Sequence, residues 1–238
     1  DLLGDASSSQ SAIIVPNPKN ETIYYLFTVG STVDPSGYHY YTIDMNGDGG
    51  NGAVVGDPVD LGGPESGDWS EKITAVESKD CGSYWVISFV NDVFHVYEVN
   101  EFGVAENPIL SKVNFKSTQS RGYLKAAPDG SRLAIAHQGI APATSGLLLY
   151  TFNNETGEVT NDGKMLFGPH STEEGLDVPY GVEFSPQGTK LYVTTTDMEK
   201  SYKLYQYDLE SNDIANSMTL IHEEESFRGA LQLGTDQK

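Results

Sequence analysis

Apolar and polar residues alternate along most of the chain in short runs, and the runs are separated by residues that favour turns. A period of two is typical of β-strands with one buried and one exposed face, and enrichment in Val, Ile, Tyr and Phe supports that interpretation. The clearest runs are IYYLFTV (23–29), YWVISFV (84–90), LAIAHQ (133–138) and LYVTTT (191–196). Helical periodicity is nearly absent, so the sequence predicts an all-β fold.

A second kind of run recurs at a nearly constant spacing. Its copies are YTIDMNGDG (41–49), YEVNEFG (97–103), YTFNNETGEV (150–159) and YQYDLESNDI (205–214). Successive copies lie 56, 53 and 55 residues apart when they are counted at Asp44, Asn100, Asn153 and Asp208. Fixed periods of this length are typical of repeat arrays and propellers, whose units cannot bury their faces alone. A β-sandwich would not produce a period near 55 residues.

Each repeat carries four strand signals, of which the first two are small and apolar and the fourth is the weakest. In a propeller blade the first strand lines the central channel and the fourth faces solvent. The sequence therefore predicts one β-propeller over residues 1–238, with four-stranded antiparallel blades at 7–63, 71–115, 121–168 and 179–224.

The segment 228–238 looks like the start of a further blade. GALQLGTDQK (229–238) aligns with GVEFSPQGTK (181–190) and GYLKAAPDGSR (122–132), and a strand signal follows both earlier copies. We therefore expect four repeats and the start of a fifth, as an open fragment of a larger ring. A closed ring of four blades is the alternative.

The chain is strongly acidic, which restricts the kinds of partner that it can bind. It has 34 Asp and Glu residues against 14 Lys and Arg residues, a formal net charge of −20. Nucleic acids and anionic membrane surfaces both require clusters of Lys and Arg, so we expect neither as a partner. No run approaches the roughly 18 apolar residues of a membrane-spanning helix, so we expect no membrane insertion.

Three residues next to predicted first strands are candidates for ligand binding at the channel mouth: Arg121, Tyr180 and Arg228. Two guanidinium groups and a phenol on an acidic protein could hold a carboxylate or a sugar acid. The alternative is that the arginines neutralise acidic loops such as Glu223–Glu225 and that the adjoining glycines let strands converge.

One loop resembles the start of a calcium site. Asp44, Asn46 and Asp48 alternate as oxygen ligands and are followed by Gly. The twelfth position, where a bidentate Glu is expected, is Val55, and turn chemistry alone explains the composition. Calcium is therefore a candidate, and no other cofactor is expected.

The aromatic residues mostly alternate with apolar residues inside strands. Trp69, Trp85 and most of the 14 tyrosines are therefore expected to pack between blades, although Tyr38–Tyr41 could instead form an exposed platform for a carbohydrate.

Catalytic patterns are missing from the sequence. It contains no GxSxG elbow, phosphate-binding loop or dinucleotide-binding glycine pattern, and its five histidines lack metal-ligand spacing. We therefore expect a protein that is not an enzyme.

Several segments resemble the propeller region of large gliding-motility-associated surface proteins, which gliding bacteria export through the type IX secretion system. They are SSSQSAIIVPNP (7–18), IYYLFTV (23–29), YYTIDMNGDGG (40–50), GYLKAAPDGSRLA (122–134), YGVEFSPQGTKLYVTTTD (180–197), LYQYDL (204–209) and RGALQLGTDQK (228–238). The phrase YGVEFSPQGTKLYV is also similar to WD-repeat-like and lactonase-like propellers. The resemblance implies about seven blades, further domains of the same polypeptide, contact with the secretion and motility machinery, and a secreted or cell-surface location.

Three functions stay open at this point. The favoured one is a non-catalytic module for recognition or adhesion, binding a protein or carbohydrate ligand on a surface. The alternatives are a lactonase-like propeller that hydrolyses a sugar lactone through Arg and acidic residues at the channel mouth, and a structural spacer.

Overall fold

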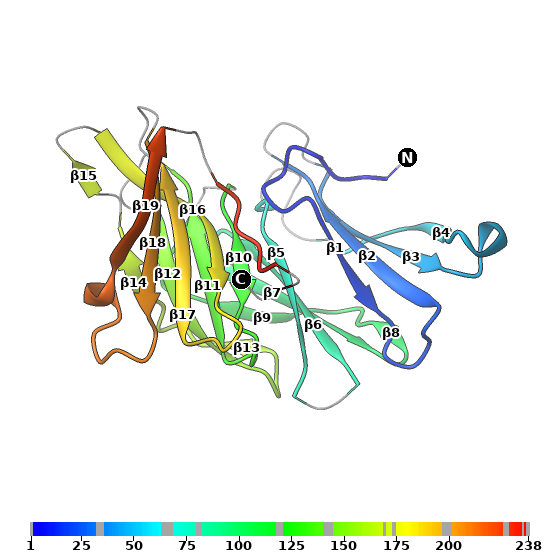
Figure 1. Cartoon of the computed structure of the whole chain (residues 1–238). Helices are drawn as coiled ribbons and strands as arrows, with labels where there is room; N and C mark the ends of the chain where they lie inside the picture. The colour runs from blue at the N-terminus through cyan, green and yellow to red at the C-terminus, as the bar shows by residue number, and fades with distance from the viewer. Residues whose placement is uncertain are drawn as a thin grey trace.

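The structure is a computed structural model, and Figure 1 shows its four sheets side by side as an open fan. It describes residues 2–31, 36–62, 69–79, 82–117, 121–139, 145–168, 170–172, 175–196, 201–225, 229–234 and 236. For residues 170–172 and 175–177 only the backbone is described.

The first two sheets, which we call blades 1 and 2, are antiparallel and follow one another along the chain. Blade 1 has the order β1 (Ala12–Pro16), β2 (Ile23–Val29), β3 (Tyr38–Asp44) and β4 (Ala53–Asp60). Blade 2 consists of β5 (Ile73–Glu77), β6 (Tyr84–Val90), β7 (Val93–Asn100), β8 (Gly103–Val104) and β9 (Ile109–Lys112). The short β8 and the longer β9 both pair with β7.

Blades 3 and 4 repeat this arrangement. Blade 3 consists of β10 (Leu124–Ala126), β11 (Arg132–His137), β12 (Gly146–Asn153), β13 (Glu158–Val159) and β14 (Lys164–Phe167). Blade 4 consists of β15 (His170–Thr172), β16 (Gly175–Phe184), β17 (Lys190–Thr196), β18 (Ser201–Asp208) and β19 (Thr219–Glu225). Two 3-10 turns, η1 (Asp48–Gly50) and η3 (Ala215–Ser217), follow the third strands of blades 1 and 4.

The same backbone hydrogen bond closes the turn after the first strand in every blade. A main-chain N–H donates to the carbonyl group at or next to the start of the second strand, over 2.9 to 3.0 Å, in the pairs Asn17–Ile23, Ser78–Ser83, Ala127–Arg132 and Ser185–Lys190. The predicted propeller fold is confirmed, and the predicted runs 23–29 and 84–90 coincide with β2 and β6.

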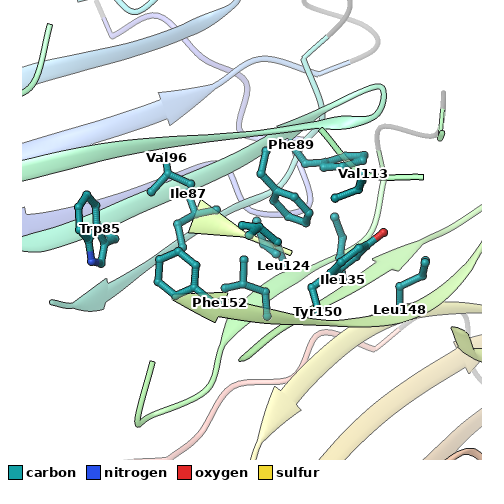
Figure 2. Packing of buried hydrophobic residues seen from close by; sticks show 13 residues of the cluster. Trp85, Ile87, Phe89, Val96, Val113, Leu124, Ile135, Leu148, Tyr150 and Phe152 are labelled. Atoms are coloured by element: carbon teal, nitrogen blue, oxygen red, sulfur yellow. The ribbon is translucent and has the colours of Figure 1, made fainter. Parts of the chain in front are cut away.

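Each pair of neighbouring blades shares one hydrophobic core. Blades 1 and 2 pack through Phe27, Tyr38 and Val86, and blades 3 and 4 pack through Leu147, Val182 and Val193, all with negligible solvent exposure. The core between blades 2 and 3 contains, among others, Trp85, Ile87, Phe89, Val96, Leu124, Ile135, Tyr150 and Phe152 (Figure 2). Burial of one such side chain contributes roughly 1.5–3 kcal/mol, so the cores hold the blades in radial order.

Blade 4 begins before its predicted start at residue 179. β16 begins at Gly175 because its first residues form a hairpin with β15. Its pairing with β17 shifts between Pro179 and Val182, which leaves one extra residue in a β-bulge. A bulge of this kind adds no hydrophobic signal, so the alternation pattern alone does not locate it.

The described segment 229–234 contains no strand, but it lies against blade 4. Thr194 Oγ1 donates to Gly229 O at 2.6 Å, and Leu233 N donates to Glu183 Oε2 at 3.3 Å. Its assignment as the first strand of a further blade stays a prediction. Among the described residues, no helix is long and apolar enough to span a membrane.

Candidate functional site

A lysine and a glutamate on neighbouring first strands form an ion pair that is shielded from solvent. Lys125 lies in β10 and Glu183 in β16, each three residues before the proline of the following turn. Lys125 Nζ lies 2.8 Å from Glu183 Oε2, and the two side chains are 22% and 15% exposed. Because solvent screens such a pair less than an exposed pair, its position is well defined and its electrostatic effect on a ligand is stronger.

Backbone groups also hold the Glu183 carboxylate. Phe184 N donates to Oε1 at 3.0 Å, and Leu233 N donates to Oε2 at 3.3 Å. Glu183 borders a cavity of about 210 Å³, whose wall also includes Tyr192, Leu204 and Gln232. A carboxylate that is held by a cation and by main-chain N–H groups thus lies in the wall of a small cavity with both apolar and polar residues.

Arg121 and Tyr180 lie on the same two chain segments as this pair: Arg121 precedes β10, and Tyr180 lies within β16. Arg121 is exposed, and its carbonyl group accepts a hydrogen bond from Gln138 N at 3.1 Å. Tyr180 lies in the bulge of β16, with its ring centroid 5.5 Å from that of Tyr123. Burial, with a smaller contribution from Tyr180, raises the pKa of Tyr123.

The bulge changes the relation between the predicted site residues. Arg121 and Gln138 lie opposite each other in blade 3, whereas Tyr180 falls inside the register shift of blade 4. The two residues therefore do not hold equivalent positions, although the sequence alignment places them together. Arg228 lies outside the described residues.

A second polar cluster lies at the start of β5. Ser9 donates to Glu71 Oε2 through its main-chain N at 3.0 Å and its Oγ at 2.9 Å. Ser9 Oγ in turn accepts a hydrogen bond from Gly122 N at 3.2 Å, which links this cluster to the strand that follows Arg121. Burial lowers the pKa of Lys72 to about 7, and the charge of Glu71 opposes this effect.

The predicted calcium residues form a local turn. Asp44 Oδ1 accepts a hydrogen bond from Asn46 N at 2.9 Å, and the Asp48 carbonyl group accepts one from Asn51 Nδ2 at 2.9 Å. Within the described part of the chain, no three His, Cys, Asp or Glu side chains gather as metal ligands. These contacts account for the loop by turn chemistry, and calcium binding stays a prediction.

The tyrosines of the proposed exposed platform are largely buried. Tyr38 has no solvent exposure and Tyr41 is 2% exposed, and the ring of Tyr38 lies 4.9 Å from that of Trp69. Trp69 and Trp85 are also buried. Packing between blades is confirmed for Tyr38, Trp69 and Trp85, and a platform at Tyr38 and Tyr41 is excluded.

The candidate residues that were predicted from the sequence do not include Lys125 and Glu183. Both are charged residues inside otherwise apolar first strands, at the same distance from the turn proline. A charged residue inside an apolar strand is the sequence feature that could have indicated this site, because a charged side chain at a half-buried position usually needs a partner of opposite charge. The opposite signs of the two charges indicate that they pair with each other.

Comparisons with known proteins agree with this fold. No protein-family model matches the sequence, and no curated protein matches it. A solved structure of a candidate 6-phosphogluconolactonase from Bacteroides fragilis is similar to it with a TM-score of 0.54 and 14% identity, over 94% of this chain and 58% of that one. The periplasmic gluconolactonase PpgL of Pseudomonas aeruginosa is similar with a TM-score of 0.53 and 14% identity, over 90% of this chain and 53% of that one.

A protein from Lactobacillus plantarum gives a TM-score of 0.53 and 16% identity, over 90% of this chain and 57% of that one. The chain thus spans less than two thirds of the length of these structures. At such identities the similarity shows the fold alone, which is a β-propeller of the kind found in proteins named as lactonases. None of these three is named for adhesion, gliding motility or type IX secretion, so that resemblance stays a prediction.

Proposed function

We propose that this chain is a four-blade sector of a propeller that hydrolyses a small sugar lactone at the inner ends of its blades. Glu183, which lines the 210 Å³ cavity and is paired with Lys125, carries the proposal. Its second support is the fold shared with proteins named as gluconolactonases. The proposal replaces the favoured interpretation of the sequence, a non-catalytic recognition module, with its lactonase-like alternative.

The chemistry needs a base, an electrostatic partner for oxygen and a binding surface for hydroxyl groups. In the proposed reaction Glu183 accepts a proton from water, and the resulting hydroxide attacks the lactone carbonyl carbon. The ring C–O bond then breaks, and the ring oxygen takes the proton back to give the open hydroxy acid. General-base assistance of this kind contributes roughly 10²–10⁴-fold.

Cations at the site have two roles in this proposal. Lys125 holds the Glu183 carboxylate in position through its 2.8 Å contact, so that the carboxylate is available as a proton acceptor. In this proposal Arg121, which is exposed before the start of β10, binds a carboxylate or phosphate group of the substrate through its planar fork of donors.

The location of the protein belongs to the same proposal. One similar structure is named as a periplasmic enzyme, which is compatible with a site of action outside the cytoplasm. Display on the cell surface and contact with secretion machinery rest on the sequence resemblance alone.

The experiment is a pH-stat assay of the full chain with glucono-δ-lactone and with 6-phosphogluconolactone, against the spontaneous rate in buffer. Glu183→Gln should lower kcat by roughly 10²-fold or more with the fold intact, because the amide accepts no proton. Lys125→Met should lower the rate less, because it removes the ion pair that positions Glu183 but keeps the carboxylate. Lys79→Met is the matched control, since Lys79 forms an exposed ion pair with Glu155 away from this site. Wild-type rates equal to the buffer rate, or a fully active Glu183→Gln variant, contradict the proposal.

A further inference from the structure

A groove of about 420 Å³ lies between blades 1 and 2, at the end of the sheets where first strands turn into second strands. Figure 1 shows β8 close to the turn between β1 and β2 in this region. Six residues that line the groove carry the argument: Pro18, Lys19, Ser83, Glu98, Asn100 and Phe102. Its volume lies in the range of roughly 300–1,000 Å³ that is typical of small-molecule sites.

The equivalent place between blades 2 and 3 is filled by the chain itself. The Asn154 carbonyl group accepts hydrogen bonds from Trp85 Nε1 at 3.0 Å, Ser78 Oγ at 3.3 Å and Lys79 N at 3.4 Å. Asn154 Nδ2 donates to Glu77 O at 3.0 Å. Asn154 therefore seals the junction between these two blades.

The groove is open because the corresponding turn of blade 2 is one residue shorter. In blade 3 the turn runs from Asn153 to Gly157, and in blade 2 it runs from Asn100 to Gly103. Trp85 and Tyr25 hold equivalent positions, because they pair with Val76 and Val15 at the same place in their blades. Gly103 still approaches the Tyr25 hydroxyl, whereas Glu101, which follows Asn100 as Asn154 follows Asn153, forms an ion pair with Lys19 of blade 1.

An exposed aromatic ring lies at the tip of the shorter turn. Phe102 is 90% exposed, the largest exposure among the described large hydrophobic residues. Next to it, Asn100 Nδ2 donates to Glu98 Oε2 at 3.3 Å, and Lys19 forms an ion pair with Glu101. An apolar ring thus stands beside an amide, carboxylates and an ammonium group, which supply both donors and acceptors.

We propose that this groove binds a neutral saccharide of one or two residues, with Phe102 stacked on the apolar face of a sugar ring and Asn100, Glu98 and Ser83 bonded to its hydroxyl groups. A sugar ring has one face rich in C–H groups and an edge of hydroxyl groups that both donate and accept, and the groove matches both. The site lies at another blade junction than the Lys125–Glu183 pair, so it is independent of the proposed lactone hydrolysis.

The negative charge around the groove favours neutral sugars over anionic ones. Glu98 and Glu101 outnumber Lys19, and the whole chain carries a net charge of −20. An anionic sugar would be repelled here, whereas the Arg121 region favours one. The two sites therefore differ in the charge of the ligand that they accept.

The experiment is a heteronuclear NMR titration of the labelled full chain with cellobiose and with maltose, and with gluconate as the anionic comparison. Shifts should concentrate on the Phe102 ring and the Asn100 side-chain amide, with a Kd in the millimolar range for at least one disaccharide. Phe102→Ala should weaken that binding about tenfold or more, which is a loss of about 1.4 kcal/mol. Phe102→Tyr keeps the ring and should bind like the wild type.

Ile221→Ala is the matched control, because Ile221 is an exposed apolar residue on β19 of blade 4. It should leave the titration unchanged. The proposal is overturned if neither disaccharide shifts Phe102 or Asn100, if Phe102→Ala binds as well as the wild type, or if gluconate binds this groove as tightly as the disaccharides.

Discussion

The side-chain amide of Gln10 forms two hydrogen bonds with the main chain of Leu124, which lies 114 positions further along the chain. Gln10 Nε2 donates to Leu124 O at 3.0 Å, and Gln10 Oε1 accepts from Leu124 N at 2.8 Å. The same oxygen accepts a weaker hydrogen bond from Ile73 N at 3.3 Å. One side chain at the start of blade 1 therefore ties the first strands of blades 2 and 3 together.

This contact predicts a loss of stability for Gln10→Ala. The substitution leaves the main-chain N–H and C=O groups of Leu124, a residue with no solvent exposure, without these partners, at a cost of roughly 2–3 kcal/mol. Gln10→Glu should lose nearly as much, because a carboxylate cannot donate to Leu124 O. Urea unfolding at neutral pH measures both variants, and midpoints within error of the wild type would contradict the prediction.

A glycine at the start of blade 3 predicts a larger effect. Gly122 has φ = +114°, and a Cβ atom there would lie 2.2 Å from the carbonyl oxygen of Ala136. Gly122→Ala therefore combines backbone strain with a clash against main chain, and we expect it to cost about 3 kcal/mol or more. Gly56→Ala is the matched control, since φ is +76° but no atom lies within 4 Å of the added Cβ. It should cost only about 1 kcal/mol. Equal melting temperatures for the two variants would show that backbone strain alone sets the loss of stability and that the clash with Ala136 adds nothing to it.

The burial of Lys72 leads us to expect that the stability of the protein rises as the pH increases above 7. Burial lowers its pKa in the folded protein to about 7, against 10.5 as the ordinary value. Between these values the unfolded chain binds the proton and the folded protein does not, so stability increases with pH at up to about 1.4 kcal/mol per unit. Lys72→Met should flatten this rise between pH 7 and about 9.5, below the range in which tyrosines titrate.

Lys116→Met is the control for Lys72→Met, because Lys116 is exposed. It should keep the slope of the wild type. Unfolding by urea at several pH values measures the slopes, and a wild-type stability that stays level over this range would count against a neutral, buried Lys72.

Local patterns predicted most of the fold, because each strand is specified by its own residues. The spacing of Asp44, Asn100, Asn153 and Asp208 gave the repeat, and the alternation of β2 and β6 gave their bounds. The extra residue in β16 was not predicted, because a bulge depends on how two strands pair and not on the sequence of either strand alone.

The candidate site was only partly predictable for the same reason. Arg121 and Tyr180 were predicted as site residues because they adjoin first strands. The Lys125–Glu183 pair could not be predicted in that way, because it depends on which side chains face one another across a blade junction. The hydrogen bonds from Gln10 to Leu124 connect residues that are far apart in the sequence, so no short sequence motif predicts them. Turn length, by contrast, was visible in the sequence at Asn100–Gly103, and only its consequence for the groove needed the structure.

His95 predicts a loss of stability on the acidic side. Its ring lies 4.8 Å from that of Trp69, and burial lowers its pKa to about 4 from an ordinary value of 6.5. Between pH 6.5 and 4 the unfolded chain therefore binds a proton that the folded protein does not, and stability falls as the pH decreases through this window. After allowance for its partial exposure, the loss attributable to His95 is roughly 1–2 kcal/mol. His95→Gln removes the titration, so its unfolding midpoint should change less between pH 6.5 and 4.5 than that of the wild type.

His222→Gln is the control, because His222 is exposed on β19 and its substitution should leave the acid sensitivity of the protein unchanged. An equal acid sensitivity of His95→Gln and the wild type would mean that the ring is protonated in place and that its contact with Trp69 does not exclude the charged form.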